Sequence, residues 1–406
     1  MTSHRFEIDG QPDFELGAPR QRPVTAIVEV PESDAAEGLV FIVPGMGSER
    51  DEGYYTMLRR YIAAKYNLVA VSVDAHCNVC RPHRSDGVAP VVLDVQSDSI
   101  YEAFGRFISA GGKVDRPLTN INDMLALLLP AKSNPVELNT IIQPPDGDYQ
   151  NFGVLAALDH LAVLNVLLDS DIAFDQTNIV CMGSSHGGYL AHMIHKFAPN
   201  TINGVIDASA YTEAIPIYLD GQFREISITE SHLNLTHHCS TKSLWQFKTP
   251  TEPYFFDTDR ALIRDVGHCE HLGHISETSE RKCQFRMIHS RFDNISPPAA
   301  KVQQAEVLNA LGYNVQLDIV EERDVDGKFI KSLDHGMGIA LELLFDKYYP
   351  TLEKRNGRTD RDLGSVLHFH GPKYTYRLRH QAGSLHADVK CEGRQFDKPA
   401  VERLAG

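Results

Sequence analysis

The chain has 406 residues, of which 42% are hydrophobic and 23% are charged, and its formal net charge is -15. This composition is enough for one large globular core, and the negative charge argues against nucleic acid and anionic membrane surfaces as main partners. The chain contains seven cysteines, an odd number, and it does not open with a basic segment followed by an apolar core, so we expect a protein of the reducing cytoplasm.

The first part of the chain alternates apolar strands with one helix. Strands are predicted at residues 5–8, 25–30, 38–43 and 67–73, and a helix is predicted at residues 51–65. The segments at 38–43 and 67–73 are almost continuously apolar, as in strands that are covered on both faces. They predict the centre of a parallel sheet.

Two long segments interrupt this alternation. Residues 75–150 contain two helical pieces, at 100–108 and 122–129, and residues 210–282 are rich in aromatic side chains. Segments of this length are too long for plain loops, so both are predicted to be insertions with structure of their own. The aromatic residues of the second insertion are Tyr211, Tyr218, Phe223, Trp245, Phe247, Tyr254, Phe255 and Phe256. They predict either a lid over a pocket or a satellite core, and composition alone does not choose between the two.

The alternation resumes between and after the insertions. The predicted elements are a helix at 152–168, strands at 179–182, 203–207, 285–288 and 315–320, a helix after Ser185, a helix with Ser296 as N-cap and Pro297 in its first position, and a last helix at 336–349. Alternating strands and helices predict a mostly parallel sheet with helices on both faces. We therefore expect one α/β domain over residues 1–350. Residues 351–406 contain three short alternating segments, which predict a small antiparallel β appendage.

A short motif in the middle of the chain is typical of a catalytic turn. Residues 179–182 predict a buried strand, Gly183-Ser-Ser-His-Gly187 predicts a tight turn, and the residues that follow predict a helix. In this context the central residue of a G-x-S-x-G pentapeptide sits on a sharp, strained turn, and its hydroxyl is exposed above the sheet. The N-terminus of the helix favours negative charge at that point. Ser185 is therefore the candidate nucleophile.

A serine nucleophile needs a base and an acid that orients the base. Asp293 lies just beyond a predicted strand, on the rim of the sheet where Ser185 is also expected. His335 lies in the loop that follows the next predicted strand, immediately before the last helix. The order Ser185, Asp293, His335 is the serine, acid, histidine order of one particular fold. Asp207, at the end of its own strand, competes for the acid role, and Asp334 is adjacent to the histidine.

Acyl transfer also needs hydrogen-bond donors for the oxyanion. The backbone N–H of His186, the residue after the nucleophile, is one expected donor. The second is expected from the loop Pro44-Gly-Met-Gly47, where glycines let the backbone approach closely. The N–H of Met46 is the favoured donor in this loop, and the N–H of Gly47 is the neighbouring option.

Three groups of cysteine and histidine residues contain ligand types that bind metals. They are Cys77 and Cys80 with His76 and His83; His237, His238 and Cys239; and His268, Cys269, His271 and His274. Zinc prefers four such ligands in a tetrahedral array, and the sequence has no second C-x-x-C at zinc-finger spacing. These groups are interpreted as structural, and no metal or cofactor is expected.

The glycine-rich blocks and the serine, acid, histidine set resemble those of the α/β-hydrolase superfamily. The extended block Gly183-Ser-Ser-His-Gly-Gly-Tyr-Leu-Ala191 resembles the dienelactone-hydrolase and prolyl-oligopeptidase branches. Together with Pro44–Gly47 and Asp334-His-Gly-Met-Gly338, it is also similar to an uncharacterised bacterial family of predicted hydrolases, which is often associated with flagellin or surface-glycan modification loci. The match runs from about residue 25 to 350. The resemblance implies an α/β-hydrolase that usually needs no cofactor, but it does not imply a substrate.

The expected function is that of a serine esterase or deacylase. It would cleave an ester, a thioester or a small acyl group through an acyl-enzyme on Ser185, and its substrate would be a small acyl compound or one derived from a glycan. A serine peptidase is less favoured, because peptidase relatives usually carry a large domain ahead of the hydrolase and about two dozen residues precede it here. A catalytically silent binding or accessory protein and an acyltransferase, both in surface-glycan modification, also stay open. The sequence indicates no oligomeric state.

Overall fold

The centre of the protein is an eight-stranded sheet. The computed structural model describes residues 1–47, 53–81, 91–130, 135–279, 281–354, 362, 365–381 and 384–391. The strands of the central sheet follow the order β1-β2-β4-β3-β7-β8-β11-β12. Strand β2 pairs antiparallel with both β1 and β4, and every further pair from β4 to β12 is parallel. This mostly parallel sheet confirms the predicted α/β-hydrolase fold.

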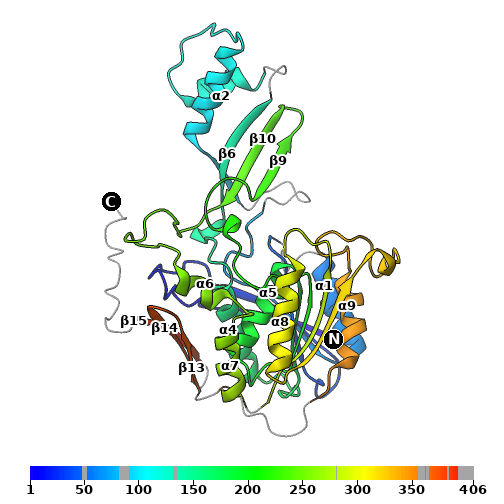
Figure 1. Cartoon of the computed structure of the whole chain (residues 1–406). Helices are drawn as coiled ribbons and strands as arrows, with labels where there is room; N and C mark the ends of the chain where they lie inside the picture. Colours follow the sequence, from blue (N-terminus) through cyan, green and yellow to red (C-terminus); the bar gives the residue numbers. More distant parts are fainter. Residues whose placement is uncertain are drawn as a thin grey trace.

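Helices cover both faces of the central sheet. Its strands are β1 (Thr2–Ile8), β2 (Val24–Val30), β3 (Leu39–Val43), β4 (Val69–Asp74), β7 (Ile179–Ser184), β8 (Gly204–Ala208), β11 (Gln284–Ser290) and β12 (Asn314–Val320). Helices α1 (Gly53–Tyr66) and α9 (Leu341–Tyr348) lie on one face, and α4 (Val154–Leu168), α5 (His186–Phe197) and α8 (Pro298–Ala310) lie on the other (Figure 1). In β3, Phe41 packs toward α4 and α5, while Val40 and Ile42 pack toward α1 and α9. Both faces of the strand are therefore buried, as its continuous apolar run predicts.

Two predicted helix starts differ from the structure. Helix α8 begins at Pro298, and Ser296 is not its N-cap. The Ser296 hydroxyl instead donates to the carbonyl of Ala210 at 3.0 Å. The last helix, α9, begins at Leu341 and not at Gly336, because residues 336–338 have φ between 52° and 78° and cannot continue a right-handed helix. Short 3-10 turns precede and follow this region at η3 (Glu322–Asp324) and η4 (Tyr349–Thr351). The first predicted helix corresponds to α1, and residues 51 and 52 of that prediction lie outside the described residues.

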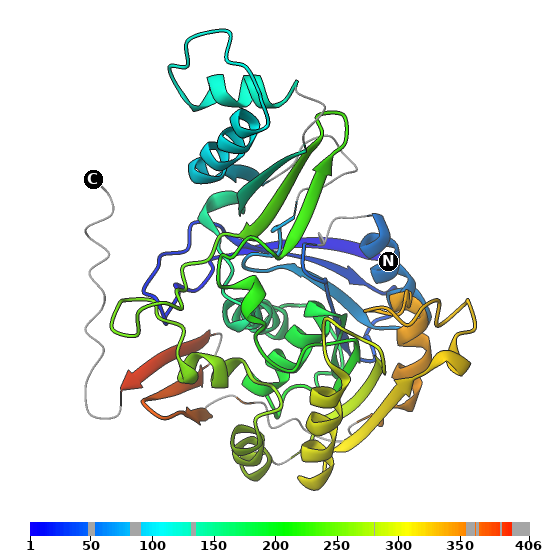
Figure 2. The ribbon, with the colours of Figure 1, turned by 45° about the horizontal axis from the view of Figure 1, so that its top comes forward.

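The two insertions meet in one second sheet. Its strands are β5 (Val92–Val95), β6 (Val136–Gln143), β10 (Leu235–Thr241) and β9 (Ile226–Glu230), in the order β5-β6-β10-β9. Strand β6 of the first insertion pairs in parallel with β10 of the second. Helices α2 (Ser97–Ser109) and α3 (Ile121–Leu128) lie at the far end, and the whole unit stands out from the body (Figures 1 and 2). We call these six elements the arm.

The rest of the second insertion packs on the body. It contains η2 (Pro216–Tyr218), α6 (Thr258–Arg264) and α7 (Cys269–Thr278). Trp245 is buried in the main core, and the guanidinium groups of Arg260 and Arg264 lie 5.3 and 5.2 Å from its ring centre. The aromatic side chains of Phe247, Tyr254 and Phe256 pack against the same core, so this part of the predicted lid or satellite core joins the main core. Helix α7 packs on the predicted antiparallel C-terminal sheet, which is confirmed as β13 (Val366–His370), β14 (Tyr374–Gln381) and β15 (Ser384–Cys391).

The short 3-10 turn η1 (Pro145–Gly147) connects the arm to α4. Among the helices that the structure describes, none combines the length and the apolar character needed to cross a membrane.

Candidate active site

Ser185 occupies the turn between β7 and α5. It has φ 57° and ψ -126°, a strained conformation for a residue with a side chain. A Cβ on Gly183 would lie 2.3 Å from the carbonyl carbon of Gly187, and a Cβ on Gly187 would lie 2.2 Å from the carbonyl oxygen of Val43. Both glycines are therefore required for so close an approach of strand and helix. The N–H of Ser185 donates to Ala208 at 2.8 Å, which ties the turn to β8.

The structure brings Ser185, His335 and Asp293 together. Nε2 of His335 lies 2.7 Å from Oγ of Ser185. Nδ1 of His335 lies 2.8 and 3.0 Å from the two carboxylate oxygens of Asp293. Burial opposes the charge on Asp293, but the hydrogen bonds from His335 and from the N–H of Ser296 outweigh it and lower the pKa of the carboxyl. An ionised Asp293 accepts from Nδ1–H, which leaves Nε2 free to accept the serine proton.

The two competing acids lie elsewhere. Asp207 is fully buried, and its carboxylate bonds to Nε2 of His192 at 2.6 Å and to Nζ of Lys301 at 3.4 Å. Burial raises the pKa of Asp207, but Lys301 and His192 overcome this effect and lower it to about 2. Asp334 is exposed, and its carbonyl accepts the N–H of Met337 at 2.8 Å. Of the three acids considered from the sequence, Asp293 is the one hydrogen-bonded to His335.

The expected oxyanion donors surround the serine turn. His186 is the first residue of α5, so its N–H lies at the positive end of that helix. Met46 and Gly47 follow β3, whose last residue, Val43, lies against Gly187 of the serine turn. The assignment of the second donor to Met46, with Gly47 as the neighbouring option, stays a prediction.

Arg81 connects the arm to the loop Pro44–Gly47, which we call the oxyanion loop after its expected role. Its Nη2 donates to Sδ of Met46 at 3.2 Å, its Nη1 donates to Thr241 of β10 at 2.9 Å, and its guanidinium forms an ion pair with the buried Glu225. A Cβ on Gly47 would lie 2.1 Å from Cγ of Arg81, and Gly47 has φ 79°. Glycine is thus needed here both for its backbone conformation and for the space that the arginine stem fills.

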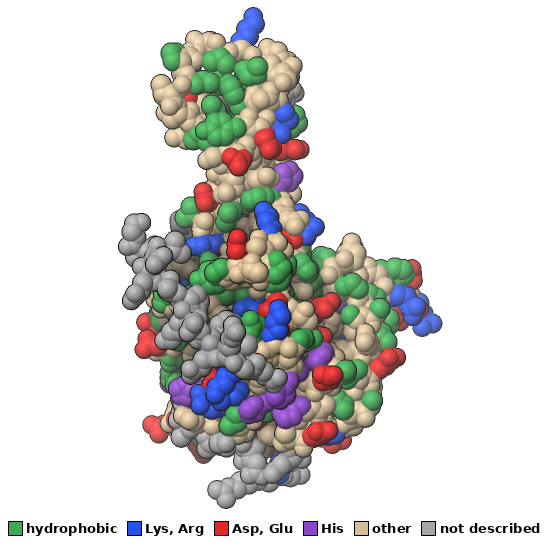
Figure 3. All heavy atoms as spheres, turned by 60° about the vertical axis from the view of Figure 1, so that its left-hand side comes forward, with side chains coloured by type: hydrophobic (Ala, Val, Ile, Leu, Met, Phe, Trp, Pro, Cys, Tyr) green, Lys and Arg blue, Asp and Glu red, His purple; other side chains and the backbone are tan. Residues whose placement is uncertain are grey.

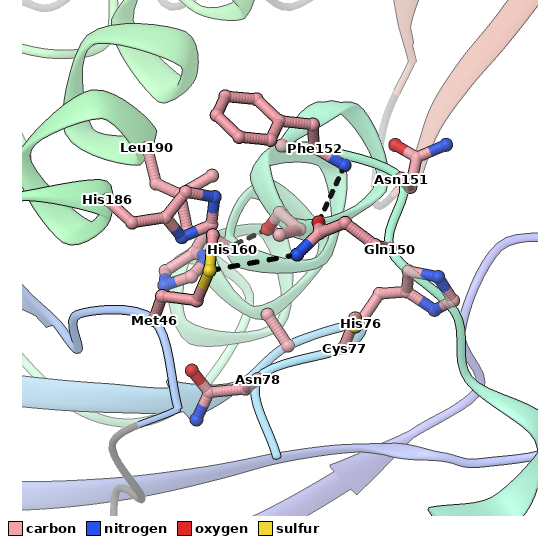
Figure 4. Close-up of a pocket in the computed structure, with 13 residues that line it drawn as sticks. Met46, His76, Cys77, Asn78, Gln150, Asn151, Phe152, His160, His186 and Leu190 are labelled. Carbon is pink, nitrogen blue, oxygen red and sulfur yellow. Dashed lines mark hydrogen bonds between the residues drawn. The ribbon is translucent and has the colours of Figure 1, made fainter. Parts of the chain in front are cut away.

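Two hollows lie near the serine turn. A cavity of about 10 Å³ lies behind the oxyanion loop, lined by Met46, Gln150, His160 and His186 among others (Figure 4), and it has room for about one water molecule. Burial lowers the pKa of His186 to about 3, so its side chain is neutral there. The second hollow is an open recess of about 370 Å³ beside Ser185. Its lining includes Gly45, Tyr54, Tyr55, Ile339, Ala340 and Leu341.

Sequence reasoning missed one polar group at the serine. The hydroxyl of Tyr211 lies 3.3 Å from Oγ of Ser185, and its ring stacks on His335 with centroids 5.7 Å apart and planes 12° apart. Tyr211 appeared in the sequence only as one aromatic among many. Its position three residues after β8 was the available signal, because this places it on the carboxyl rim of the sheet, where Ser185 also lies.

The cysteine and histidine groups have structural partners. Cys77 and Cys80 are buried free thiols that hydrogen-bond to each other. His237 bonds to Thr140 at 2.9 Å, and Nε2 of His271 donates to the carbonyl of His370 at 2.9 Å. His83 lies outside the described residues. Within the part of the chain that the structure describes, no three side chains of histidine, cysteine, aspartate or glutamate form a group that could hold a metal ion.

Similar folds occur among solved structures of hydrolases. A puromycin-hydrolysing peptidase of Mycobacterium tuberculosis shares 15% identity, with a TM-score of 0.44, 86% of this chain covered and 40% of that one. Acylaminoacyl peptidase of Pyrococcus horikoshii shares 14% identity, with a TM-score of 0.46 and coverages of 88% and 43%. The chain thus spans less than half the length of these peptidases. S-formylglutathione hydrolase of Agrobacterium tumefaciens shares 13% identity, with a TM-score of 0.44 and coverages of 87% and 95%.

The sequence comparisons give a family without an assigned activity. No curated protein shows significant sequence similarity to this chain. The model of the family described as "Protein of unknown function (DUF2920)" matches residues 4–381. This match includes every residue of the site described above, and the chain belongs to the DUF2920 family.

Proposed function

We propose that the protein is a serine hydrolase that cleaves an ester, a thioester or a small acyl group through an acyl-enzyme on Ser185. One observation carries this proposal: an unbroken hydrogen-bond chain runs from Ser185 through His335 to the ionised Asp293, with 2.7 Å and 2.8 Å links. The strained backbone of Ser185 adds support. Such strain lowers the stability of the fold, and it is typical of turns that expose a catalytic hydroxyl.

The proposed reaction has two halves. Oγ of Ser185 bonds to the carbonyl carbon, its proton moves to Nε2 of His335, and the C=O electron pair moves onto the oxygen, which the N–H groups of His186 and Met46 bind. The bond to the leaving group then breaks, and His335 protonates that group. Water attacks the acyl-enzyme by the same route and releases the acid. Asp293 holds the imidazole and stabilises its positive charge.

The open recess beside Ser185 supports the proposal that the protein binds the acyl part of its substrate there. Ile339, Ala340 and Leu341 give it an apolar wall, and the rings of Tyr54 and Tyr55 line it as well. Such a wall favours a short hydrocarbon chain, and the described residues that line the recess carry no charged side chain.

A fluorophosphonate probe tests the nucleophile. Wild type, Ser185→Ala and the neighbouring Ser184→Ala are incubated with the probe and weighed as intact proteins. Labelling of the wild type and of Ser184→Ala, together with no labelling of Ser185→Ala, supports the proposal. Equal labelling of all three proteins would place the reactive group elsewhere, and no labelling of the folded wild type would favour a binding protein.

Matched substrates then separate esterase from peptidase. The same acyl group is supplied as a p-nitrophenyl ester, a thioester and a p-nitroanilide, with acyl chains of increasing length. The proposal expects turnover of the esters, absent in Ser185→Ala, with little turnover of the anilide. Faster turnover of the anilide than of the esters would favour a serine peptidase.

A further inference from the structure

Tyr211 uses its hydroxyl in an unusual way for a buried tyrosine. It is 3% exposed, and the hydrogen bonds described for its hydroxyl join it to Ser185 at 3.3 Å and to the hydroxyl of Tyr218 at 3.2 Å. The equally buried Tyr189 instead donates to a backbone carbonyl, that of Arg264, at 2.8 Å. A structural tyrosine normally satisfies its hydroxyl in that second way. The Tyr211 hydroxyl faces the nucleophile.

The backbone around Tyr211 is fixed by the two loops that carry the other site residues. The N–H of Gly336, next to His335, donates to Oγ of Ser209 at 3.0 Å. The hydroxyl of Ser296, in the Asp293 loop, donates to the carbonyl of Ala210 at 3.0 Å. The two residues before Tyr211 are thus tied to both loops, so its ring has a defined place on the face of His335.

The number of available hydrogens decides which hydroxyl donates between Ser185 and Tyr211. Ser185 has one hydroxyl hydrogen, and the 2.7 Å contact with His335 is much shorter than the 3.3 Å contact with Tyr211. The serine therefore donates to His335, and in a hydrogen bond between Ser185 and Tyr211 the tyrosine is the donor. Burial and the neighbouring Tyr218 raise the pKa of Tyr211, so it keeps its proton at neutral pH.

We propose that Tyr211 is a further catalytic residue, whose hydroxyl donates a hydrogen bond to the leaving oxygen of an ester substrate. This inference rests on the function proposed above. The oxyanion is assigned to the backbone N–H groups of His186 and Met46, whereas the ring of Tyr211 stacks on the imidazole of His335, the group that must protonate the leaving oxygen. When the bond between carbon and the leaving oxygen breaks, its electron pair goes to that oxygen, which takes the proton from His335 and accepts a hydrogen bond from Tyr211. Tyr211 keeps its own proton.

Tyr218 has a supporting role as a positioning residue. Its hydroxyl lies 3.2 Å from that of Tyr211, and when Tyr218 donates its hydrogen to the Tyr211 oxygen, the hydrogen of Tyr211 is left for the reaction centre. Tyr218 ends η2, which packs on β10 at the base of the arm. The second insertion thereby contributes a polar group to the reaction centre.

The test compares leaving groups of different quality. The kcat/KM values of wild type, Tyr211→Phe, Tyr218→Phe and the control Tyr61→Phe are measured on a p-nitrophenyl ester and an ethyl ester of the acyl group that the wild type prefers. Tyr61 lies on α1, and its hydroxyl bonds to Asp346. Ethoxide needs assistance to leave, whereas p-nitrophenolate needs little, so a donor to the leaving oxygen matters mainly for the ethyl ester.

The kcat/KM of Tyr211→Phe on the ethyl ester is expected to fall about 10- to 100-fold. The fall in its kcat/KM on the p-nitrophenyl ester should be smaller by a factor of at least about 10. Tyr218→Phe shows a smaller loss of the same pattern, and Tyr61→Phe shows none. Equal losses on both esters, or no loss, would overturn the role of Tyr211. The fluorophosphonate probe loses fluoride, which leaves without such a donor, so Tyr211→Phe is still expected to react with the probe. Absence of labelling in the wild type would instead overturn the proposed function itself.

Discussion

Two buried aspartates near the rim of the sheet have separate tasks, and a pair of substitutions distinguishes them. Asp293→Asn removes the charge that fixes the His335 tautomer, so kcat is expected to fall about 10³- to 10⁴-fold. The asparagine still fits the space, so the thermal midpoint should move little. Ester turnover and thermal unfolding of the same preparation measure both effects.

Asp207→Asn serves as the matched comparison. Asp207 neutralises Lys301, and both side chains are fully buried. Removing one partner of a buried pair leaves the other charge uncompensated, at a cost of about 3–5 kcal/mol. The expected loss is therefore in the free energy of unfolding, measured in urea, with a smaller change in kcat. If Asp207→Asn abolished turnover while Asp293→Asn spared it, the acid role would belong to Asp207.

His271 gives a prediction about acid stability. Burial and then the charge of Lys196 lower the pKa of His271 to about 2, and the nearby His268 and His370 act in the same direction. The unfolded chain takes up this proton near pH 6.5 and the folded protein only near pH 2. The lowered pKa of His271 therefore makes a contribution to the free energy of unfolding that is complete above pH 6.5 and is lost as the pH falls toward 2.

His271→Gln removes this titration and keeps a donor for the carbonyl of His370. Between pH 6.5 and 4.5 the wild type should lose about 2 kcal/mol more of its unfolding free energy than the variant. Urea unfolding at a series of pH values measures the difference. Parallel curves for the two proteins would contradict the prediction.

Sequence reasoning named the residues of the serine turn because local pattern determines them. Ser185 follows a strand and precedes a helix within a few residues, and Asp293 and His335 each stand after a strand of their own. The function of Tyr211 could not be read in the same way. It depends on a stacking contact with His335, a residue more than a hundred positions away. Such contacts leave no periodic trace in the sequence.

At the scale of elements, the meeting of β7 and α5 depends on Gly187. A Cβ at this position would lie 2.2 Å from the Val43 carbonyl oxygen, and only a shift of backbone could relieve that contact. Gly187→Ala is expected to destabilise the protein by several kcal/mol, of the order seen for severe overpacking. Thermal unfolding of the purified variant measures this loss.

Gly273→Ala is the control for that substitution. Gly273 lies inside α7, and a Cβ there would meet nothing within 4 Å. Because alanine favours a helix over glycine, this variant should be more stable by about 0.5–1 kcal/mol. A similar thermal midpoint for the two variants would show that the close approach at Gly187 is relaxed without cost.

The helix starts that sequence reasoning missed also have distant causes. Ser296 precedes two prolines and so has the pattern of an N-cap, but its hydroxyl binds the carbonyl of Ala210. That partner belongs to the turn after β8, which the local sequence around Ser296 does not reveal. The strand and helix cores were predictable because period and apolarity are local, whereas the ends depend on tertiary partners.

At the scale of the whole molecule, the arm was the least predictable feature. Length and composition indicate two separate insertions. That they share a sheet follows from the parallel pairing of β6 with β10, whose residues lie almost a hundred positions apart. Arg81 then links the base of this sheet to the oxyanion loop through Glu225 and Met46. The arm and the α/β domain are thus joined next to the candidate active site.

The far end of the arm should unfold locally before the body does. Its apolar cluster, which includes Ile100, Leu128 and Leu138, is separate from the two main core clusters. Helix α2 leaves Tyr101 54% and Ile108 42% exposed, and Figure 3 shows apolar side chains gathered at this end. Few buried contacts mean a low free energy of local opening.

Hydrogen exchange measures this difference directly. Helices α2 and α8 have 13 residues each, which makes them a matched pair. Amides of α2 are expected to exchange at least about 100-fold faster than those of α8, while amides of β7 and β11 exchange at the rate of global unfolding. The base of the arm, held by the ion pair of Arg81 with Glu225, should show intermediate protection, and Glu225→Gln should lower it without changing α8. Equal protection of α2 and α8 would mean that the arm and the body unfold as one cooperative unit.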